Sequence, residues 1–580
     1  MIDQWDEAAI AVEPVINTEP PKPVDQKPAS RSGTWPVSTQ KEFLIIADEH
    51  DRPSLYKPDG EENKLVSGGI WINGLARDSE STGWCLVIDF VDMDNNKRQW
   101  LMARNKLSGS RQDLLKDLYD RGLFIADDKK LAQYIRYGRN DKYRTVDRTG
   151  WHDGCFVLPD QVIGDKKILL NNARPPIINK SGTLKSWRDN VAAACAGNSR
   201  LAFGISSGFA SPMLELVGAD GGGFHIVGVT SLGKTKVLKA STTVFGAKML
   251  SWNTTANALE STAETHSHIG LSLDEIGEMD PSQVGKAVYM LANGNGKTRA
   301  RQDGTAKPPS THKLIVLTNG EKSLGEHMAS VGRKTMAGQE IRLINIEADA
   351  GKGYGIFDTI HESPDSSHFA DSFDLMTQEH TGHAGPEFVR YIIENREECK
   401  VDIRDLSDIF FEANGVSDEV GQVQRVAKRF ALVAAAGEIA TKIGITGWEE
   451  HEALRSAGIL YKQWRSNWTV SGGREHEEAI ELVRGFLQVH KARFIRDSFV
   501  PQNCVGYARD SEFWIFPKVF SSEVCSDIRL STVTQALLDA GFLVPEKNSK
   551  KRLARRTPPG EGQQRFRVIR DSILSDDDNV

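Results

Sequence analysis

The first part of the chain passes from a polar segment into short apolar runs. Residues 1–40 hold acidic side chains and six prolines but few large apolar groups, so they bury too little surface to offset the entropy of ordering. Short apolar runs bounded by Gly, Pro, Asp or Asn follow at 43–46, 69–72 and 84–90. Helical spacing appears at 111–121 and 129–137. We predict a disordered acidic, proline-rich tail over 1–40 and an N-terminal β-rich α+β domain over 41–185.

The middle of the chain has a different spacing of apolar residues. Between residues 223 and 347, apolar strand-like runs alternate with helical stretches, the pattern of a parallel α/β sheet. With the apolar segment before it, this pattern predicts a core domain over 186–380. Helices with apolar stripes follow at 387–397 and 423–443, and they predict a helical lid over 381–470.

The last section begins, in our prediction, at the turn Ser471-Gly472-Gly473. A helix at 476–489, short strands near 513–516, a helix at 531–540 and a basic hairpin are expected after it. That order resembles a winged helix, so we predict a winged-helix-like domain over 471–580. The predicted fold class is α/β overall, with further domains on both sides of the sheet-containing core.

Composition narrows the class of protein. Hydrophobic residues make up 39% of the chain and charged residues 26%, which is ordinary for a globular protein. No apolar run approaches the roughly 20 residues that span a bilayer, and the start of the chain lacks the pattern of a signal peptide. We expect a cytoplasmic protein with no membrane partner. With a net charge of -7, any nucleic acid must be bound by local basic surfaces.

One segment carries a specific phosphate-binding motif. The residues Gly228-Val229-Thr230-Ser231-Leu232-Gly233-Lys234-Thr235 match G-x-x-x-x-G-K-[ST], between a strand-like run and a helical stretch that continues from Lys236. Such a P-loop directs its backbone N–H groups and the helix N-terminus at phosphates. We predict that residues 228–236 bind ATP, with Lys234 at the β- and γ-phosphates and the Thr235 hydroxyl on Mg²⁺. The alternative is a chance glycine-rich turn.

Polar residues end two further apolar runs. The run 269–273 ends in Asp274-Glu275, and the run 314–317 ends in Thr318-Asn319. On a strand beside the P-loop strand, Asp274 would complete the Mg²⁺ shell and Glu275 would orient and deprotonate the attacking water. Asn319 is predicted to sense the γ-phosphate. Taken singly, each of these residues could belong to a solvated turn.

An arginine enters the next apolar run. Arg342 precedes the apolar residues 343–346, and it is a candidate for an arginine finger that completes the site of a neighbouring subunit in a ring. An intrachain salt bridge is the alternative. Arg333 is a second candidate.

Several stretches together resemble one family. They lie at 149–152, 228–235, 253–257, 271–276, 289–294, 337–342 and 425–430. These motifs resemble the bacterial and phage-borne family called domain of unknown function 927, over roughly residues 40–470. The resemblance implies an AAA+-type P-loop ATPase carried by prophages, integrative elements and satellites, often beside replication functions.

The motif order is also similar to that of superfamily three and phage primase-helicase ATPases. That similarity implies a hairpin in the pore of a ring that contacts the backbone of single-stranded DNA through Lys297, Arg299, Arg301 and Lys307. A solvated loop is the alternative. It also implies a nucleotide-sensing arginine on the lid helix, either Arg425 or Arg429. No zinc-binding or primase motif precedes the P-loop, so primer synthesis is not expected.

The C-terminal basic cluster contrasts with the acidic chain. We predict contacts with nucleic acid phosphates from Lys550, Lys551, Arg552, Arg555 and Arg556. A flexible basic tail is the alternative.

The motifs together predict an ATP-dependent DNA helicase or translocase of a mobile element or phage. It would act as a hexameric ring with single-stranded DNA in the central pore and with hydrolysis at the subunit interfaces. The alternative is an ATP-switched DNA-binding or defence-assembly factor without unwinding activity. Phosphoryl transfer to a small molecule is disfavoured, because such an enzyme does not need the second acid, Glu275.

Overall fold

The structure is a computed structural model that describes residues 42–574, apart from 51, 137–140, 173, 295, 297–298, 301–305, 308–310, 334–336, 417–420, 497–499, 527 and 547–551. The predicted tail over residues 1–40 lies outside these residues. The chain divides into two compact units, Met1–Leu460 and Tyr461–Val580. Each unit is described by itself.

The N-terminal part of the first unit is built on a mixed sheet with the strand order β11-β7-β4-β5-β6. Its strands are β4 (Ile70–Arg77), β5 (Cys85–Val91), β6 (Lys97–Ala103), β7 (Asp141–Val146) and β11 (Ile168–Leu170). Two smaller sheets contain β1 (Leu44–Ala47), β2 (Pro53–Asp59) and β3 (Glu62–Gly68), and β8 (Gly150–His152), β9 (Cys155–Val157) and β10 (Val162–Ile163).

Two helices cover one face of this mixed sheet. They are α1 (Arg111–Asp120) and α2 (Asp128–Arg136), at the positions where the apolar spacing predicts them. Leu114 and Ile135 of these helices pack with Ile88 and Phe90 of β5 in one buried cluster. The predicted β-rich character of this part and both of its helices are therefore confirmed.

The core sheet of the first unit is entirely parallel, with the order β13-β14-β17-β12-β18. Its strands are β12 (Gly222–Val227), β13 (Leu250–Ser251), β14 (Leu271–Asp274), β17 (Ile315–Gly320) and β18 (Leu343–Glu347). The predicted parallel α/β sheet is confirmed. One expectation is wrong: the strand that ends in Asp274 does not lie beside the P-loop strand β12, because β17 separates them.

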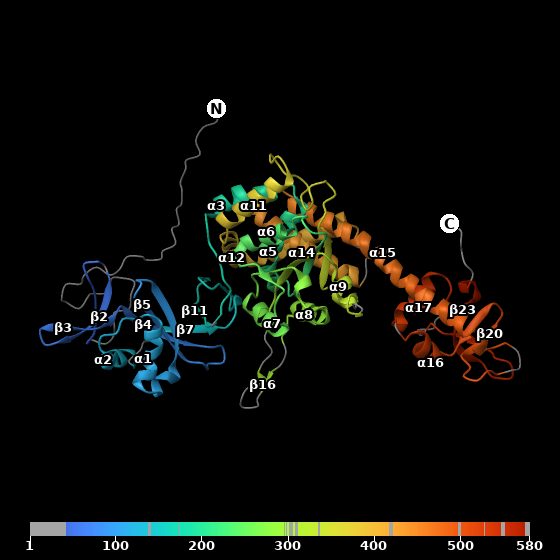
Figure 1. Ribbon diagram of the computed structural model, residues 1–580, viewed down its shortest axis with the longest axis horizontal. Helices are drawn as coiled ribbons and strands as arrows, with labels where there is room; N and C mark the ends of the chain where they lie inside the picture. The colour runs from blue at the N-terminus through green and yellow to red at the C-terminus, as the bar shows by residue number, and fades with distance from the viewer. Residues whose placement is uncertain are drawn as a thin grey trace. The chain divides into compact units, whose positions relative to one another are not determined.

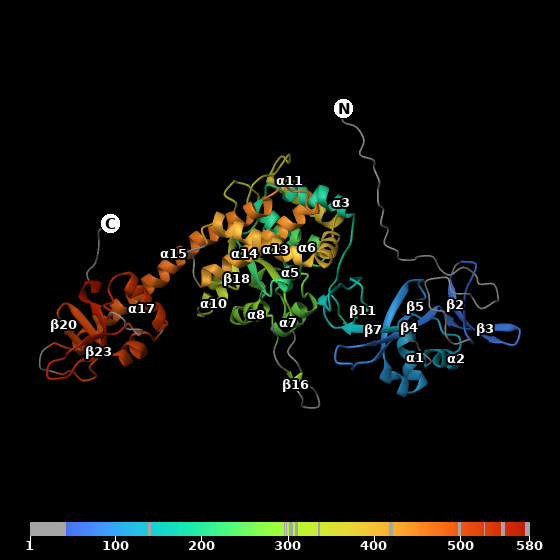
Figure 2. The same ribbon diagram turned by 180° about the vertical axis from the view of Figure 1, so that it is seen from behind.

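Helices pack on both faces of the core sheet (Figures 1 and 2). The short elements α3 (Leu184–Trp187) and α4 (Ala193–Cys195) precede α5 (Ser199–Leu216), and the remaining helices within this part are α6 (Lys234–Phe245), α7 (Ala256–Thr265), α8 (Pro281–Asn293), α9 (Leu324–Ala329) and α10 (Ala337–Glu340). Apolar residues of α7 and α8, such as Leu259 and Val288, pack with Leu273 of β14 and Val316 of β17.

The helices after β18 are α11 (Ser366–Glu379), α12 (Ala384–Glu394), α13 (Arg396–Ala413), α14 (Gln422–Lys442) and α15 (Glu452–Val489). They do not form a lid apart from the sheet, because α14 packs directly against it. Phe430 of α14 and Phe203 of α5 have ring centroids 5.0 Å and 4.8 Å from that of Phe224 in β12. The apolar stripe predicted for the second lid helix is therefore part of the core.

The predicted turn at residues 471–473 is wrong, because α15 runs through it from Glu452 to Val489. Glycine within a helix costs only about 1 kcal/mol relative to alanine, so two adjacent glycines need not end a helix of this length. The boundary between the two compact units falls at 460/461, within this helix.

The second unit contains a sheet with the order β19-β20-β21-β23-β22. Its strands are β19 (Phe494–Ile495), β20 (Gly506–Arg509), β21 (Glu512–Ile515), β22 (Ala554–Arg556) and β23 (Gln564–Arg570), and its short helices are α16 (Pro517–Val519) and α17 (Leu530–Asp539). Val533 and Leu537 of α17 pack with Val483 of α15. The helix α17 precedes the antiparallel pair β22–β23, which is the order that the sequence predicts for a helix and a wing.

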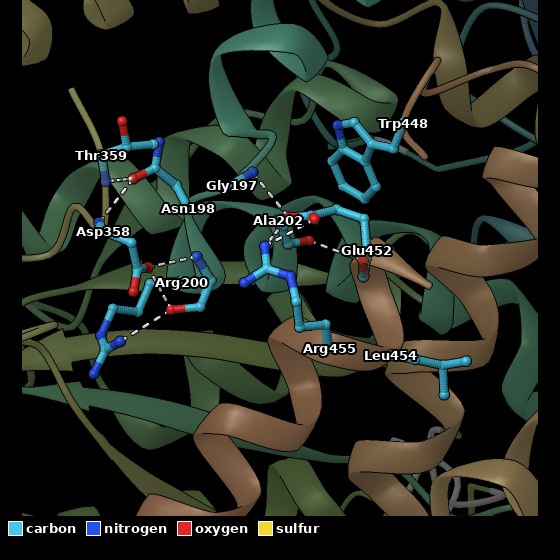
Figure 3. Close-up of polar contacts among 12 residues, drawn as sticks. Gly197, Asn198, Arg200, Ala202, Asp358, Thr359, Trp448, Glu452, Leu454 and Arg455 are labelled. Carbon is cyan, nitrogen blue, oxygen red and sulfur yellow. Dashed lines mark hydrogen bonds and ion pairs between the residues drawn. The ribbon is translucent and has the colours of Figure 1, made fainter. Parts of the chain in front are cut away.

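The segment after β18 is tied to the start of α5 (Figure 3). Asn198 accepts hydrogen bonds from the backbone N–H groups of Asp358 and Thr359 at 2.8 and 3.0 Å. The guanidinium of Arg200, which is 2% exposed, donates to the carbonyls of Glu347 and Asp349 at 3.0 and 2.8 Å. These bonds fix the chain at the point where it leaves β18.

The same end of α5 contacts the first turn of α15. Glu452 accepts a hydrogen bond from the N–H of Gly197 at 2.9 Å, and Arg455 donates to both oxygens of its carboxylate at 2.7 and 2.8 Å (Figure 3). The helix α15 thus begins anchored to the core of the first unit.

Replacing Arg200 by Met should destabilise the first unit by about 2–4 kcal/mol, because two backbone carbonyls would lose a charged donor. Urea unfolding followed by tryptophan fluorescence measures this change. The control is Arg404→Met, since the side chain of Arg404 is 68% exposed and pairs with its chain neighbour Asp405. Equal stability of the two variants would contradict the anchoring role of Arg200.

Candidate functional site

The P-loop lies at the carboxyl edge of the core sheet, between the end of β12 and the start of α6. Gly233 has φ 89° and Ser231 has φ 68°, so the loop uses left-handed conformations that favour glycine at the first of these positions. A Cβ on Gly228 would lie 2.8 Å from the Cβ of Ala348. The motif glycines are therefore required by the path of the loop.

The segment after β18 is joined to this loop and to the end of β12 by backbone hydrogen bonds. The N–H of Ile356 donates to the carbonyl of Leu232 at 3.0 Å, and the N–H of Ala348 donates to that of Val227 at 2.7 Å. This is the segment that Arg200 and Asn198 hold in place. The shape of the loop thus depends on residues more than a hundred positions away in the chain.

The functional side chains of the motif differ in their contacts. The ammonium of Lys234 donates to the carbonyls of Gly228 and Val229 at 2.7 and 2.8 Å. The hydroxyl of Thr235 lies 3.2 Å from Oδ1 of Asp274. Asp274 reaches Thr235 across β17, because α6 packs on both β14 and β17.

Asn319 joins these groups. Its side-chain amide donates to Oδ1 of Asp274 at 2.7 Å and to the hydroxyl of Thr235 at 3.2 Å, while its Oδ1 accepts the N–H of Glu275 at 2.7 Å. Asn319 is 2% exposed. The intervening strand β17 thus supplies the residue that joins Asp274, at the end of β14, to Thr235, at the start of α6.

Glu275 lies at the same edge but its carboxylate is turned to its own chain. Its φ is 53°, and Oε1 accepts the N–H of Gly277 at 3.2 Å, which caps the short 3-10 turn Ile276–Glu278. A non-glycine residue in this region of φ and ψ carries strain of about 1–3 kcal/mol. To act on a water at the P-loop, the carboxylate has to leave Gly277.

Two residues of the loop have contacts that sequence reasoning missed. The ammonium of Lys236 lies 2.7 Å from Asp374 of α11, which also pairs with Lys239 at 2.9 Å, so its side chain anchors α6 and is not directed to the loop. The hydroxyl of Thr230 donates to the carboxylate of Glu321. No local motif marks Glu321, because it reaches the loop only through the pairing of β17 with β12.

Arg342 lies at the opposite, amino edge of the sheet, immediately before β18. Its Nε donates to the side chain of Asn293 at 2.9 Å, and its guanidinium carbon lies 4.3 Å from the ring centroid of Tyr289. Arg342 therefore cannot reach the P-loop of its own chain. Arg333, the second candidate, donates to the carbonyl of Ser282 at 2.6 Å.

Arg429 also lies at the amino edge, where it donates to the carbonyls of Gly221 and Ile341 at 3.2 and 2.8 Å. Burial lowers its pKa to about 10, and the nearby charge of Arg342 acts in the same direction. The prediction that Arg429 senses the nucleotide is wrong for the P-loop of its own chain. Arg425 is exposed on the same helix.

The structure describes the predicted pore hairpin only in part. Arg299–Ala300 (β15) pairs antiparallel with Ala306–Lys307 (β16), with Arg299 opposite Lys307. Lys297 and Arg301 lie outside the described residues. The short strand pair agrees with the predicted hairpin, and the DNA contacts stay a prediction.

Intrachain partners engage part of the C-terminal basic cluster. Arg556 donates to both oxygens of Glu512 at 2.9 and 2.8 Å, Arg552 donates to Gln535 at 2.7 Å, and Arg555 lies 3.5 Å from Glu546. Lys550 and Lys551 lie outside the described residues. Arg556 is held in a half-buried, two-point ion pair with Glu512, and the phosphate contacts of this cluster stay a prediction.

His225 lies beneath the P-loop in β12. It is fully buried, and its Nε2 lies 2.9 Å from the carbonyl of Lys322. Burial lowers the pKa of His225 to about 4, although the hydrogen bond to Lys322 acts in the opposite direction. The imidazole is therefore neutral and donates to Lys322 at neutral pH.

Comparison with known proteins bears on the family of this chain. Residues 50–311 match the model of the family described as "Domain of unknown function (DUF927)". The chain carries a DUF927 domain. The resemblance seen in the sequence is thereby confirmed, although the matched residues are fewer than the roughly 40–470 expected. The DUF927 domain includes the P-loop, Asp274 and Glu275, whereas Asn319 and Arg342 follow it in the chain.

Comparison with solved structures bears on the fold. The chain is similar to a structure described as "SCCmec type IV Cch - active helicase", with a TM-score of 0.63 and 18% identity over 91% of this chain and 98% of that one. The chain therefore shares its fold with that structure. The apo C-terminal region of NrS-1 gives a TM-score of 0.25 at 12% identity, over 66% of this chain and 88% of that one. No curated protein matches the sequence.

Two further properties concern the residues that the structure describes. None of their helices combines the length and hydropathy needed to cross a membrane. All six cysteines of the chain are free thiols.

Replacing His225 by Gln should make unfolding less dependent on pH between 6.5 and 4.5. The unfolded chain binds a proton at His225 near pH 6.5 and the folded chain only near pH 4, so this residue favours the folded state above pH 6.5. About 2 kcal/mol of that contribution is lost by pH 5. Urea unfolding at pH 7.5, 6 and 5 measures the slope, with His50→Gln at an exposed site as control. An unchanged slope for the His225 variant would refute the assignment.

Proposed function

We propose that this protein is an ATP-dependent DNA helicase or translocase of a mobile element or phage, acting as a ring with hydrolysis at subunit interfaces. The observation that carries the proposal is the contact of Asn319 with Asp274, Thr235 and the backbone of Glu275 at the P-loop edge of the sheet. The fold shared with a structure described as an active helicase supports it.

The P-loop fits a nucleoside triphosphate. The N-terminus of the twelve-residue helix α6 and the loop N–H groups provide a favourable field for phosphates. Lys234 would exchange its two carbonyl partners for the β- and γ-phosphates. Backbone N–H groups of residues 228–236 would make the remaining contacts, with the side chain of Lys236 left in its ion pair with Asp374.

The side chains of Thr235 and Asp274 fit Mg²⁺. Thr235 and Asp274 present hard oxygen ligands 3.2 Å apart, as this ion prefers. When bound, Mg²⁺ would neutralise the charge that develops on the phosphate oxygens. Asn319 would keep Asp274 and Thr235 in register, and Glu275 would accept the proton of the attacking water after its carboxylate leaves Gly277.

Arg342 would act on the P-loop of a neighbouring subunit. Its place at the amino edge separates it from the P-loop of the same chain, and Asn293 and Tyr289 orient its guanidinium. A site completed in trans couples hydrolysis to ring assembly, which we propose to be hexameric. Single-stranded DNA would pass through the pore along Arg299 and Lys307 of the hairpin, with Lys297 and Arg301, and the second unit would add contacts through Arg552, Arg555, Lys550 and Lys551.

A second function is favoured by one observation. The backbone of Glu275 is strained, and its carboxylate caps the following turn. A conformation with this capping bond and one without it would be the two states of an ATP switch. In that case the protein would bind DNA or assemble with a partner in the ATP-bound state without unwinding DNA.

Replacing Glu275 by Gln distinguishes the two functions. Hydrolysis should fall by about 10²–10⁴-fold because the general base is lost, while ATP binding is retained. A motor should then unwind no forked duplex, whereas a switch should stay in its active, DNA-bound state. The control is Glu278→Gln, a carboxylate at the end of the same turn that contacts Ser251. If wild-type protein hydrolyses ATP no faster with single-stranded DNA and separates no forked duplex, the motor function is refuted.

Replacing Asn319 by Ala should lower kcat for ATP hydrolysis by about 100-fold, with less than about a threefold change in ATP affinity, because the amide positions Asp274 and Glu275 more than it binds nucleotide. Steady-state kinetics and nucleotide titration separate these quantities. Asn345→Ala serves as the control, since Asn345 lies in β18, two strands beyond β17. Equal losses in both variants would contradict the central position of Asn319.

A further inference from the structure

Arg429 is a partly buried charged residue of α14 in the first unit. Its guanidinium joins helix α14 to the starts of two strands, because Gly221 precedes β12 and Ile341 precedes Arg342 and β18. The sheet edge is shaped around it: a Cβ on Gly222, which has φ 151°, would lie 2.3 Å from the guanidinium carbon. Such a guanidinium is costly to bury, so a purely apolar contact would fill this space at lower cost.

Arg342 directly follows Ile341, whose carbonyl accepts one of the hydrogen bonds from Arg429. Three contacts restrict Arg342: its N–H donates to the carbonyl of Gln339 at 3.0 Å, its Nε donates to Asn293, and its guanidinium stacks on Tyr289. The bond from Arg429 to Ile341 fixes the peptide that immediately precedes Arg342. Like charges repel, so the nearby Arg429 also favours a path of the Arg342 guanidinium away from the core and toward Tyr289.

We propose that Arg429 is a positioning residue for Arg342, which it directs out of the amino edge toward the P-loop of a neighbouring subunit. The inference rests on the proposed function, in which Arg342 acts in trans. Helix α14 would then link the helices after β18 to the contact between subunits. A shift of α14 would then be transmitted to the site of the next subunit through one guanidinium and one carbonyl.

The test uses the full chain with Arg429→Met and Arg429→Lys. The Met variant should lower kcat for ATP hydrolysis at least tenfold, with ATP binding by each subunit unchanged within threefold, because the P-loop of the same chain is at the other edge of the sheet. The Lys variant should recover part of the rate, since one ammonium can bond to one of the two carbonyls. Lys428→Met, at the exposed neighbouring position, should keep the wild-type rate.

Mixed oligomers separate positioning from a general defect. Lys234→Ala subunits lack a working P-loop but carry an intact Arg342, so coexpression with Arg342→Ala subunits should restore part of the hydrolysis. Coexpression of Lys234→Ala with Arg429→Met should do the same. Coexpression of Arg342→Ala with Arg429→Met should restore nothing, because neither subunit presents a correctly placed Arg342 guanidinium.

Each result has a definite meaning. Recovery in the pair Arg342→Ala and Arg429→Met, or loss of ATP binding in both Arg429 variants, would overturn the positioning role and leave the proposed function intact. Failure of the pair Lys234→Ala and Arg342→Ala to recover would instead overturn the trans arrangement of the proposed function.

Discussion

The contact of Asn319 with Asp274 and Thr235 is the interaction on which the site depends. Each of the three residues belongs to a different element: β14 and β17 end, and α6 begins, at the carboxyl edge of one parallel sheet. Because parallel strands present all their carboxyl ends at one edge, polar residues that follow buried strands gather there. The low exposure of Asn319 strengthens its hydrogen bonds relative to those in water, so this edge is well ordered where phosphate chemistry would require it.

The shape of the P-loop is secured at a distance from the motif itself. Arg200 and Asn198, at the start of the buried helix α5, hold the segment that follows β18, and this segment donates hydrogen bonds to the loop through Ile356. A buried arginine bonded to backbone carbonyls is stable only where all of its partners are in place. The loop is therefore coupled to the packing of the whole first unit.

The two edges of the core sheet hold different kinds of polar residue. The carboxyl edge holds the P-loop and its polar partners, whereas the amino edge holds Arg342 and Arg429 with Asn293 and Tyr289. One chain thus presents an edge with the P-loop and a cationic edge on opposite sides of a single sheet. Such an arrangement suits head-to-tail assembly, in which the second edge of one copy meets the first edge of the next.

The sequence by itself determined the residues of the P-loop, the parallel sheet, the helices α1, α2 and α17, and the family, because these depend on local spacing, on alternation of apolar runs and on a motif whose glycines have one conformational use. It did not determine that β17 lies between β12 and β14, or that α15 continues through two glycines. It also did not determine three side-chain pairs: Lys236 with Asp374, Thr230 with Glu321, and Arg556 with Glu512. Those features follow from strand order and from contacts between residues far apart in the chain. Only the tertiary structure decides them, because one local pattern is compatible with many strand orders and side-chain pairs. These alternatives differ in the free energy of burying their residues.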